Sequence, residues 1–438
     1  MRKYYLVTFG CQMNVHDSEK IAGLLESEAY TEAESPRDAD VIVFNTCSIR
    51  EKAEQKFFSS LGRLRTLKMK KPGVKIAVAG CVAQQKADEI RERAPFVDFI
   101  VGPQNIHAFR TIIASPSAPA YKHDDTYTGD NPSITELDLP ASRTDTVRAW
   151  VNIMYGCDNF CSYCIVPYTR GREKSRPSGS IISEIRALSE KGYKEVTLLG
   201  QNVNSYRSDT DFPGLLGRID SIPGIERIRF VTSHPKDLSD DLVYAIRDFE
   251  KVCEHIHLPL QSGSTKILGL MNRNYTYDDY LRRVGFLKKE IPGIAITTDI
   301  IAGFPQEKDE DHRATLRALG EIEFDGLFAF NYSPRPGTTA ATMEGHIDDA
   351  LKSQRLYEIL ELQNGVTDRK NKTLEGTLQE ILVEGSDEKE RGLLTGRTRA
   401  NKIVTLPSSP AIERGDRVLV KIVRAHRHSL EGAAVERS

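Results

Sequence analysis

The motif Cys157-x3-Cys161-x2-Cys164 constrains this 438-residue chain more strongly than any other feature of its sequence. It follows directly on the apolar run Trp150–Met154. Three closely spaced thiolates form a soft-ligand site, and a closed structural zinc site usually has four protein ligands. A [4Fe–4S] cluster has four irons, so three cysteines leave one iron open to a small molecule. The spacing predicts such a cluster, with zinc as the alternative.

Three further cysteines each follow a β-rich run, at intervals close to the length of a βαβ unit. A helical pattern follows each of them. Alternating strands and helices predict a parallel, doubly wound sheet, and ligands of such sheets bind beyond the carboxyl ends of the strands. We therefore expect the three thiolates to converge on a second cluster site, although buried cysteines are often core residues. The runs and their cysteines are Tyr4–Phe9 with Cys11, Val41–Phe44 with Cys47, and Lys75–Ala79 with Cys81; the helices are expected at 17–27, 51–67 and 84–93.

The rest of the chain divides by composition and periodicity. Residues 114–145 are rich in Pro, Ser, Thr and Asp and read as a surface linker. Six strand candidates then alternate with helical patterns, too few for an eight-stranded barrel, so an open, partial (β/α)6 barrel is expected. The expected regions are an N-terminal α/β domain (1–120), a linker (121–145), the partial barrel (146–371) and a small all-β, OB-like barrel (372–438). The six strands are expected at 150–155, 195–199, 227–232, 255–260, 294–301 and 326–331.

The net charge and the cysteine content of the chain limit which partners and which cellular compartment can be expected. The net charge is −2, so any RNA affinity must come from a local patch. The seven cysteines group by threes, which favours metal ligation in a reducing cytoplasm over a disulfide framework. No signal peptide and no long apolar run is apparent, so a cytoplasmic protein without membrane contact is expected. In the last region two basic loops favour contact with an RNA backbone over a merely solvated face; the candidate residues are Arg397, Arg399, Lys402, Arg424 and Arg427.

Three stretches resemble known families. Residues 155–172, around the first cysteine motif, resemble the radical S-adenosylmethionine (SAM) superfamily and, within it, the MiaB-type tRNA methylthiotransferases. The stretch Asn45–Lys56 resembles the same enzymes, and Gly392–Thr398 resembles the TRAM domains of RNA-modifying enzymes. The likeness covers nearly the whole chain in the same domain order.

The resemblance implies a set of site residues. The six cysteines Cys11, Cys47, Cys81, Cys157, Cys161 and Cys164 would be catalytic and would hold two [4Fe–4S] clusters, one of which binds SAM. Polar residues at the strand ends would line the SAM site, with Tyr163 beside the adenine. The expected SAM contacts are Tyr163, Gln201, Asn202, Ser233, Gln261, Arg273 and Asn331. Cys253 lacks partner cysteines and is expected in the core.

The reaction that the resemblance implies replaces a C–H bond with C–S–CH3, using one SAM as methyl donor and another as radical source. The expected target is carbon 2 of an isopentenyl-modified adenosine next to the tRNA anticodon. Relatives that act on threonylcarbamoyl-adenosine or on a ribosomal-protein aspartate remain alternatives. The expected partners are the anticodon stem-loop, an electron donor such as a flavodoxin or ferredoxin, and an iron–sulfur carrier. A two-cluster electron-transfer protein and a zinc-bound RNA-binding protein are the alternatives from other classes.

Overall fold

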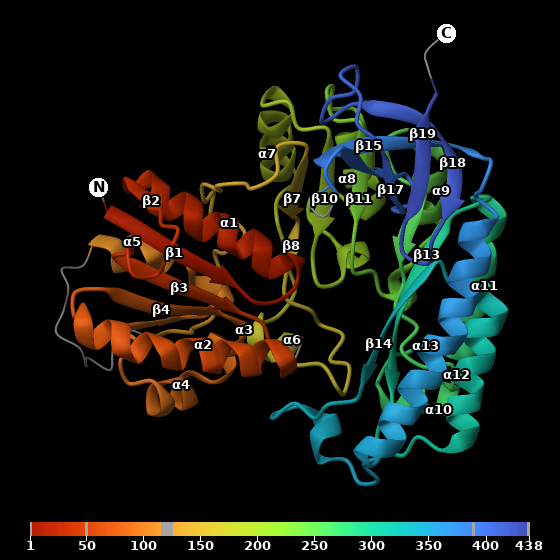
Figure 1. Cartoon of the computed structure of the whole chain (residues 1–438). Helices are drawn as coiled ribbons and strands as arrows, with labels where there is room; N and C mark the ends of the chain where they lie inside the picture. The colour runs from red at the N-terminus through yellow and green to blue at the C-terminus, as the bar shows by residue number, and fades with distance from the viewer. Residues whose placement is uncertain (1, 49–50, 115–125, 388–389, 436–438) are drawn as a thin grey trace.

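A computed structural model describes residues 2–48, 51–114, 126–387 and 390–435. Figure 1 shows an α/β domain at one side, a barrel-like α/β domain at the other, and a small β-barrel above the latter. Within the described ranges no helix is long and apolar enough to cross a bilayer. The predicted order of an α/β domain, a partial barrel and an all-β module is confirmed.

The N-terminal domain is a parallel sheet with strand order β2-β1-β3-β4-β5-β6. Successive side chains of a strand point to opposite faces, so Val41 and Val43 pack with α1 and α5, whereas Ile42 and Phe44 pack with α2 and α4. The sheet is therefore doubly wound, as predicted. Its strands are Arg2–Thr8 (β1), Tyr30–Glu32 (β2), Val41–Thr46 (β3), Lys75–Gly80 (β4), Phe99–Val101 (β5) and Thr126–Tyr127 (β6). Its helices are Gln12–Ser27 (α1), Glu51–Lys70 (α2), Cys81–Gln85 (α3), Ala87–Arg93 (α4) and Phe109–Ala114 (α5), with a 3-10 turn at Pro103–Ala108.

Two details differ from the sequence reading. The helix expected at 84–93 is two helices, α3 and α4, and α3 begins at Cys81 itself. Within the segment read as a linker, Thr126–Tyr127 pairs with β5 as a short edge strand. Two residues are too few to show a periodicity, which is why the sequence does not reveal this strand. The domain bounds themselves stay predictions.

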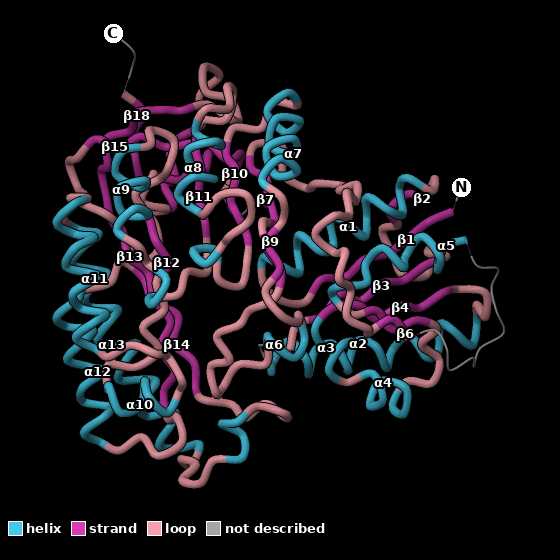
Figure 2. The backbone as a smooth tube through the Cα atoms, turned by 180° about the vertical axis from the view of Figure 1, so that it is seen from behind, coloured by secondary structure: helices cyan, strands magenta, loops and turns pink. Residues whose placement is uncertain are grey.

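The central domain contains the six predicted parallel strands in two sheets, β11-β10-β7 and β12-β13-β14. Between the two sheets, Ile228 of β11 forms an isolated parallel bridge with Val252, just before β12, and Ser233 donates its backbone N–H to the His257 carbonyl at 3.4 Å. Helices cover the outer face (Figure 2). The strands are Arg148–Asn152 (β7), Glu195–Leu199 (β10), Arg227–Phe230 (β11), His255–His257 (β12), Ala295–Ala302 (β13) and Gly326–Asn331 (β14). The helices are Val166–Thr169 (α6), Ser178–Glu190 (α7), Phe212–Asp220 (α8), Asp240–Asp248 (α9), Thr265–Leu270 (α10), Tyr277–Glu290 (α11), Asp309–Ile322 (α12) and Asp349–Lys372 (α13). The hairpin strands Met154–Tyr155 (β8) and Lys174–Ser175 (β9) flank the first cysteine motif.

The C-terminal module is a closed five-stranded barrel with strand order β15-β16-β17-β19-β18. It lies against the amino ends of the central strands, because Arg227 at the start of β11 donates to the Arg397 carbonyl at 2.6 Å. Arg229 donates likewise to the Arg399 carbonyl at 2.8 Å. Polar residues at the carboxyl ends of the same strands therefore face away from this module. Its strands are Leu378–Ser386 (β15), Leu393–Thr398 (β16), Ile403–Pro407 (β17), Arg417–Ala425 (β18) and Leu430–Ala434 (β19).

Candidate active site

The loop that carries Cys157, Cys161 and Cys164 folds back on itself between β8 and α6. Its first turn requires a glycine, since Gly156 has φ 68° and a Cβ there would lie 2.0 Å from the Arg172 carbonyl oxygen. Burial raises the pKa of Cys164 to about 12, and the neighbouring Cys161 and Cys157 thiols add to the rise. Burial and Cys161 also raise the pKa of Cys157. The three thiols therefore lie close enough for each to influence the charge of the others.

The segment that follows α10 holds this loop in place. Ser162 donates its backbone N–H to the Met271 carbonyl at 3.0 Å, and Asn272 donates its side-chain amide to the Phe160 carbonyl at 3.0 Å. The buried guanidinium of Arg273 lies 3.5 Å from both the Cys161 Sγ and the Tyr163 hydroxyl. Arg273 therefore places a positive charge beside Cys161, and this charge opposes the rise that burial causes in the pKa of Cys164.

Several of the expected SAM contacts have buried oxygen atoms without a hydrogen-bond partner among the described residues. A buried acceptor without a donor is unfavourable by about 1–3 kcal/mol, so such atoms indicate a ligand that donates to them. Backbone strain occurs at the same strand ends, since Thr232 and Gln261 have φ 65° and 71°. The residues at this end of the barrel therefore fit a polar ligand such as SAM. The partnerless atoms are Gln201 Oε1, Asn202 Oδ1, Ser233 Oγ and Asn331 Oδ1.

The second cysteine set lies at the ends of three adjacent strands. Cys11 immediately precedes α1, Cys47 follows β3, and Cys81 opens α3 after β4. A hydrogen bond with the Cys47 thiol is the main cause that lowers the pKa of Cys11 to about 6. The Cβ of a residue replacing Gly10 would lie 2.5 Å from the Cys47 Cβ. The fold thus brings Cys11 and Cys47 together, with Cys81 at the end of the adjacent strand β4, while Cys253 is buried.

Both cysteine sets fit a cluster better than a single ion. In the described part of the chain no three Cys, His, Asp or Glu side chains stand close enough to share one metal ion. A [4Fe–4S] cluster does not need that geometry, because each thiolate binds a different iron. The chemistry of the donors, three cysteines at each site, matches the cluster.

An aromatic wall that the sequence analysis missed lies in the barrel interior. Leu327 and Ala329 of β14 pack into the main core, so the alternate residues Phe328 and Phe330 face the interior, 57% and 43% exposed. The Phe328 ring lies 6.2 Å from the ring of His257. In the sequence, only the alternation of residues along β14 indicates this wall. The alternation does not reveal which of the two faces of the strand packs against the helices.

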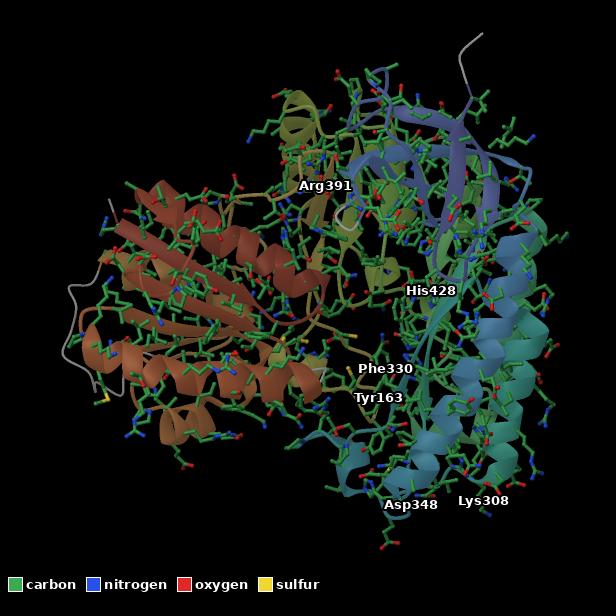
Figure 3. The ribbon with its side chains drawn as sticks, in the orientation of Figure 1. Tyr163, Lys308, Phe330, Asp348, Arg391 and His428 are labelled. Carbon is green, nitrogen blue, oxygen red and sulfur yellow. The ribbon has the colours of Figure 1, made fainter. Side chains whose placement is uncertain are left out.

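The end of this wall that Phe330 forms, at the carboxyl end of β14, lies toward the first cysteine loop. Phe330 pairs in register with Ile301, and Tyr163 of the loop packs in the same apolar cluster as Ile301. Figure 3 labels both Phe330 and Tyr163. Ile301 and its apolar cluster thus lie between the aromatic wall and Tyr163, one of the expected SAM contacts.

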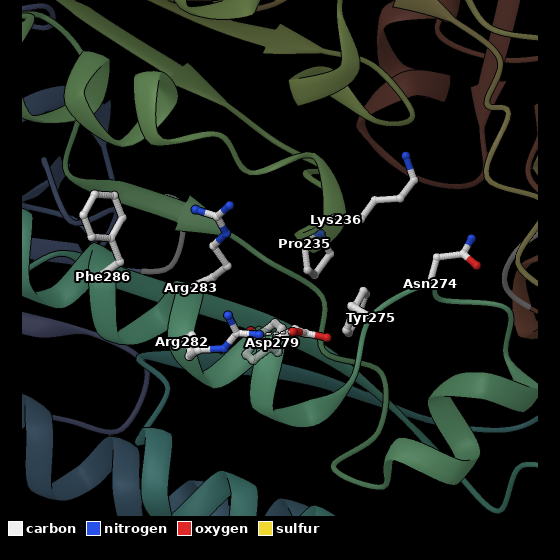
Figure 4. Close-up of a pocket in the computed structure, with 9 residues that line it drawn as sticks. Pro235, Lys236, Asn274, Tyr275, Asp279, Arg282, Arg283 and Phe286 are labelled. Atoms are coloured by element: carbon white, nitrogen blue, oxygen red, sulfur yellow. Dashed lines mark hydrogen bonds and ion pairs between the residues drawn. The ribbon is translucent and has the colours of Figure 1, made fainter.

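A surface pocket of about 420 Å³ opens on the outer side of the barrel (Figure 4). It lies between Pro235 and the start of α11, and none of the six cysteines of the two sets lines it. Its cations Lys236, Arg282 and Arg283 each pair with a neighbouring carboxylate. The pocket therefore offers no unpaired charge to an anionic ligand.

The basic residues of the C-terminal barrel fall into two groups. The side chains of Arg399 and Lys402 point to the central domain, where Arg399 pairs with Glu254 at 2.7 Å and Lys402 donates to the Asn371 side chain at 2.8 Å. Arg397 pairs with Glu384 at 3.0 Å, and Glu384 also pairs with Arg148 of β7. Arg399 and Lys402 thus connect the two domains directly, and Arg397 does so only through Glu384, which the sequence reading did not foresee. By contrast, Arg424 is exposed, and Arg427 is exposed beside Asp368 at 2.9 Å.

The fold and the first cysteine loop define a radical SAM protein, and residues 151–319 match the model of the radical SAM superfamily. Residues 3–102 match the uncharacterized protein family UPF0004, and residues 372–435 match the TRAM domain. The tRNA-2-methylthio-N(6)-dimethylallyladenosine synthase of Thermodesulfovibrio yellowstonii is 55% identical over 98% of both chains. That of Syntrophus aciditrophicus is 51% identical over 98% of this chain and 93% of its own. The chain belongs to the tRNA-2-methylthio-N(6)-dimethylallyladenosine synthase family, so the resemblance drawn from the sequence is confirmed.

Solved structures share the fold at low identity. The radical SAM methyltransferase TsrM from Kitasatospora setae superposes with a TM-score of 0.56 at 14% identity, covering 78% of this chain and 75% of its own. The cobalamin-dependent SAM radical enzyme OxsB superposes with a TM-score of 0.55 at 10% identity, covering 84% and 56%. These structures support the partial barrel and the domain beside it.

Proposed function

We propose that this chain replaces the hydrogen on carbon 2 of a dimethylallyl-modified adenosine in tRNA with a methylthio group. The observation that carries the proposal is the pair of three-cysteine sites on a chain 55% identical to a named synthase. Two [4Fe–4S] clusters and SAM would supply the radical, the sulfur and the methyl group. Cys157, Cys161 and Cys164 would hold the SAM-binding cluster, and the N-terminal cysteines the other.

The chain's own residues would bind and orient SAM. The partnerless oxygens of Gln201, Asn202 and Asn331 would accept hydrogen bonds from SAM, whose amino group needs such acceptors. Ser233 and Gln261 would contact its ribose or carboxylate, and Arg273 would hold Cys161 and Tyr163 in place. Each of these assignments is based on the strand of the barrel at whose carboxyl end the residue lies.

The aromatic wall of Phe328 and Phe330 would receive the adenine and its dimethylallyl group. An unpaired base of an RNA loop can be splayed out at modest cost and stacked on aromatic side chains. An apolar substituent on the base adds surface that such a wall buries. The wall lies beside Tyr163, which brings the base to the site where SAM would be cleaved.

The remaining parts of the proposal concern partners. Arg424 and Arg427 would contact the phosphates of the anticodon stem-loop, with Arg397, Arg399 and Lys402 contributing only by giving up their present partners. The enzyme would work in the cytoplasm, where a flavodoxin or ferredoxin supplies electrons and an iron–sulfur carrier loads the clusters.

The deciding test is nucleoside mass analysis of tRNA from a strain that lacks this gene, with and without complementation. Loss of the 2-methylthio group from dimethylallyladenosine is expected, with recovery on complementation. Unchanged modification would overturn the proposal, and loss from threonylcarbamoyl-adenosine or from a ribosomal-protein aspartate would point to those targets. Absence of 5′-deoxyadenosine from the reduced, reconstituted protein with SAM would leave the electron-transfer alternative.

A further inference from the structure

Four polar side chains of β12 and β13 face the interior of the central barrel, beside the aromatic wall. Along these strands they alternate with Ile256, Ile296 and Ile300, which pack into the main core under the helices. The polar set therefore lies on the face of the sheet that also carries Phe328 and Phe330. Its members are His255, His257, Thr297 and Asp299.

Hydrogen bonds fix the orientation of the His257 ring within this set. Its Nδ1 lies 3.0 Å from the Thr297 hydroxyl, and the same hydroxyl lies 3.4 Å from the His255 Nε2. Burial and the charge of Arg229 lower the pKa of His255 to about 3, so His255 is neutral. The other ring nitrogen of His257, Nε2, lies 3.4 Å from the Asp299 carboxylate. Because a carboxylate only accepts, the hydrogen belongs on Nε2.

The contact between His257 and Asp299 is longer than a structural ion pair needs, since a charge-assisted N–H···O bond measures about 2.7–2.9 Å. In the described part of the chain, no other cation or donor bonds to the Asp299 carboxylate. The two side chains are 16% and 28% exposed. By comparison, the Asp311 carboxylate accepts from Ser264 at 2.6 Å and from Lys266 at 2.8 Å. His257 and Asp299 therefore keep bonding capacity for a ligand.

This pair presents a donor next to an acceptor, beside an aromatic ring. Phe328 pairs in register with Asp299, and its ring lies 6.2 Å from the His257 ring at an interplanar angle of 69°. The two rings are not stacked on each other, so the exposed Phe328 ring stays open to a planar ligand. The N7 edge of adenine presents N7 as an acceptor next to N6–H as a donor, and a single dimethylallyl substituent leaves one hydrogen on N6. This edge complements an Nε2–H group beside a carboxylate.

We propose that His257 and Asp299 recognise the N7 edge of the modified adenine, with His257 donating to N7 and Asp299 accepting from N6–H. This inference rests on the proposed function, which places the adenine on the aromatic wall. Carbon 2 lies on the opposite edge of the purine from N7, so a base held in this way points carbon 2 away from the pair. Asp299 lies two residues before Ile301 on β13, and Ile301 packs with Tyr163 of the first cysteine loop. The pair therefore turns carbon 2 toward the carboxyl ends of the strands, where SAM would be cleaved.

The test measures the affinity of the reconstituted full chain, without SAM, for synthetic anticodon stem-loops that carry N6-dimethylallyladenosine. Two analogues each remove one group from the base: a 7-deaza analogue has C–H in place of N7, and an ether analogue has oxygen in place of N6–H. The parent should bind each analogue about tenfold more weakly, because each loses one hydrogen bond to the pair. His257→Phe keeps an aromatic ring without Nε2–H and should no longer favour the standard stem-loop over the 7-deaza analogue. Asp299→Leu should no longer favour it over the ether analogue.

His312→Phe is the matched control, because His312 pairs with Glu358 at 2.8 Å between α12 and α13; it should keep both preferences. Loss of the matching preference in each variant supports the inference, since a structural defect would weaken all three stem-loops alike. Equal affinity of the parent for the three stem-loops overturns the inference, leaves the proposed function intact and requires no variant to fold. A folded His257→Phe that still favours the standard stem-loop over the 7-deaza analogue also overturns it. A parent that binds the unmodified stem-loop as tightly as the dimethylallylated one would instead overturn the proposed substrate, and the inference with it.

Discussion

The buried arginines at the domain junction should determine whether the C-terminal barrel stays docked. Arg229 donates to Glu195 at 2.9 Å and to the carbonyls of Thr398 and Arg399 at 2.7 and 2.8 Å. The Arg229 and Glu195 side chains are 6% and 3% exposed. Arg229→Met keeps much of the apolar stem but leaves the Glu195 carboxylate buried without its cation.

Breaking a buried pair by removing one partner destabilises by about 3–5 kcal/mol. The loss falls on the junction, so it lowers the free energy of local opening there. Since every 1.4 kcal/mol is about a tenfold change, amide exchange at residues 398–402 should accelerate by roughly two to three and a half orders of magnitude. Hydrogen exchange with mass spectrometry measures this directly and does not require two-state unfolding of a multidomain chain.

A matched control separates the effect of burying an ion pair from the effect of its short distance. Arg218 and Asp209 pair at 2.6 Å, but their side chains are 47% and 53% exposed. Arg218→Met should therefore change stability by no more than about 1 kcal/mol. The double variant with Glu195→Leu and Arg229→Met should recover much of the loss, because neither side chain of this pair then leaves a buried charge without its partner. Exchange at 398–402 that stays within a few-fold of the parent in Arg229→Met would refute the reasoning.

Four further variants test other parts of the chain. Glu19→Gln should flatten stability against pH: burial raises the pKa of Glu19 from 4.5 to about 7, so its contribution is present below pH 4.5 and is lost as the pH rises through about 7. Urea unfolding between pH 5 and 8 measures this, and an unchanged slope would count against it. Cys47→Ala should leave SAM cleavage measurable but stop methylthiolation; methylthio product from this variant would exclude the N-terminal site as the sulfur site. Phe328→Ala should raise KM for modified tRNA about tenfold, by the loss of one stacked base at roughly 1–3 kcal/mol, and a change confined to kcat would argue against stacking. Arg424→Glu should weaken tRNA binding and reduce its salt dependence, measured by filter binding at several salt concentrations.

Local patterns of the sequence predict the architecture because they repeat. Each β-rich run before Cys11, Cys47 and Cys81 is a strand of one parallel sheet, and the six strands of the partial barrel occur where alternation places them. A cysteine after each of three strands predicts convergence, since parallel strands end at one edge of a sheet. These predictions depend on short-range periodicity alone.

Contacts between distant segments are what the sequence conceals. Arg399 reads as a basic loop residue, but its partner Glu254 lies 145 positions earlier in the chain. Arg170 is one of several cations after the first cysteine motif, and nothing in its neighbours signals burial against Asp17. The charge of a side chain predicts that it needs a partner without saying which one. The interior location of Phe330 depends in the same way on which face of β14 the helices cover.

The way the central sheet ends has a consequence for how a substrate enters. Among the described strands, β7 and β14 each pair on one side only, so the wall of the barrel has a lengthwise seam. The interior of a closed barrel is accessible only from its two ends. A nucleotide within an RNA strand, bonded to neighbours on both sides, cannot enter such an interior end-on. A seam would let the nucleotide enter from the side, while the RNA strand continues outside the barrel in both directions. Phe330 lies on β14, one of the two strands that border this seam.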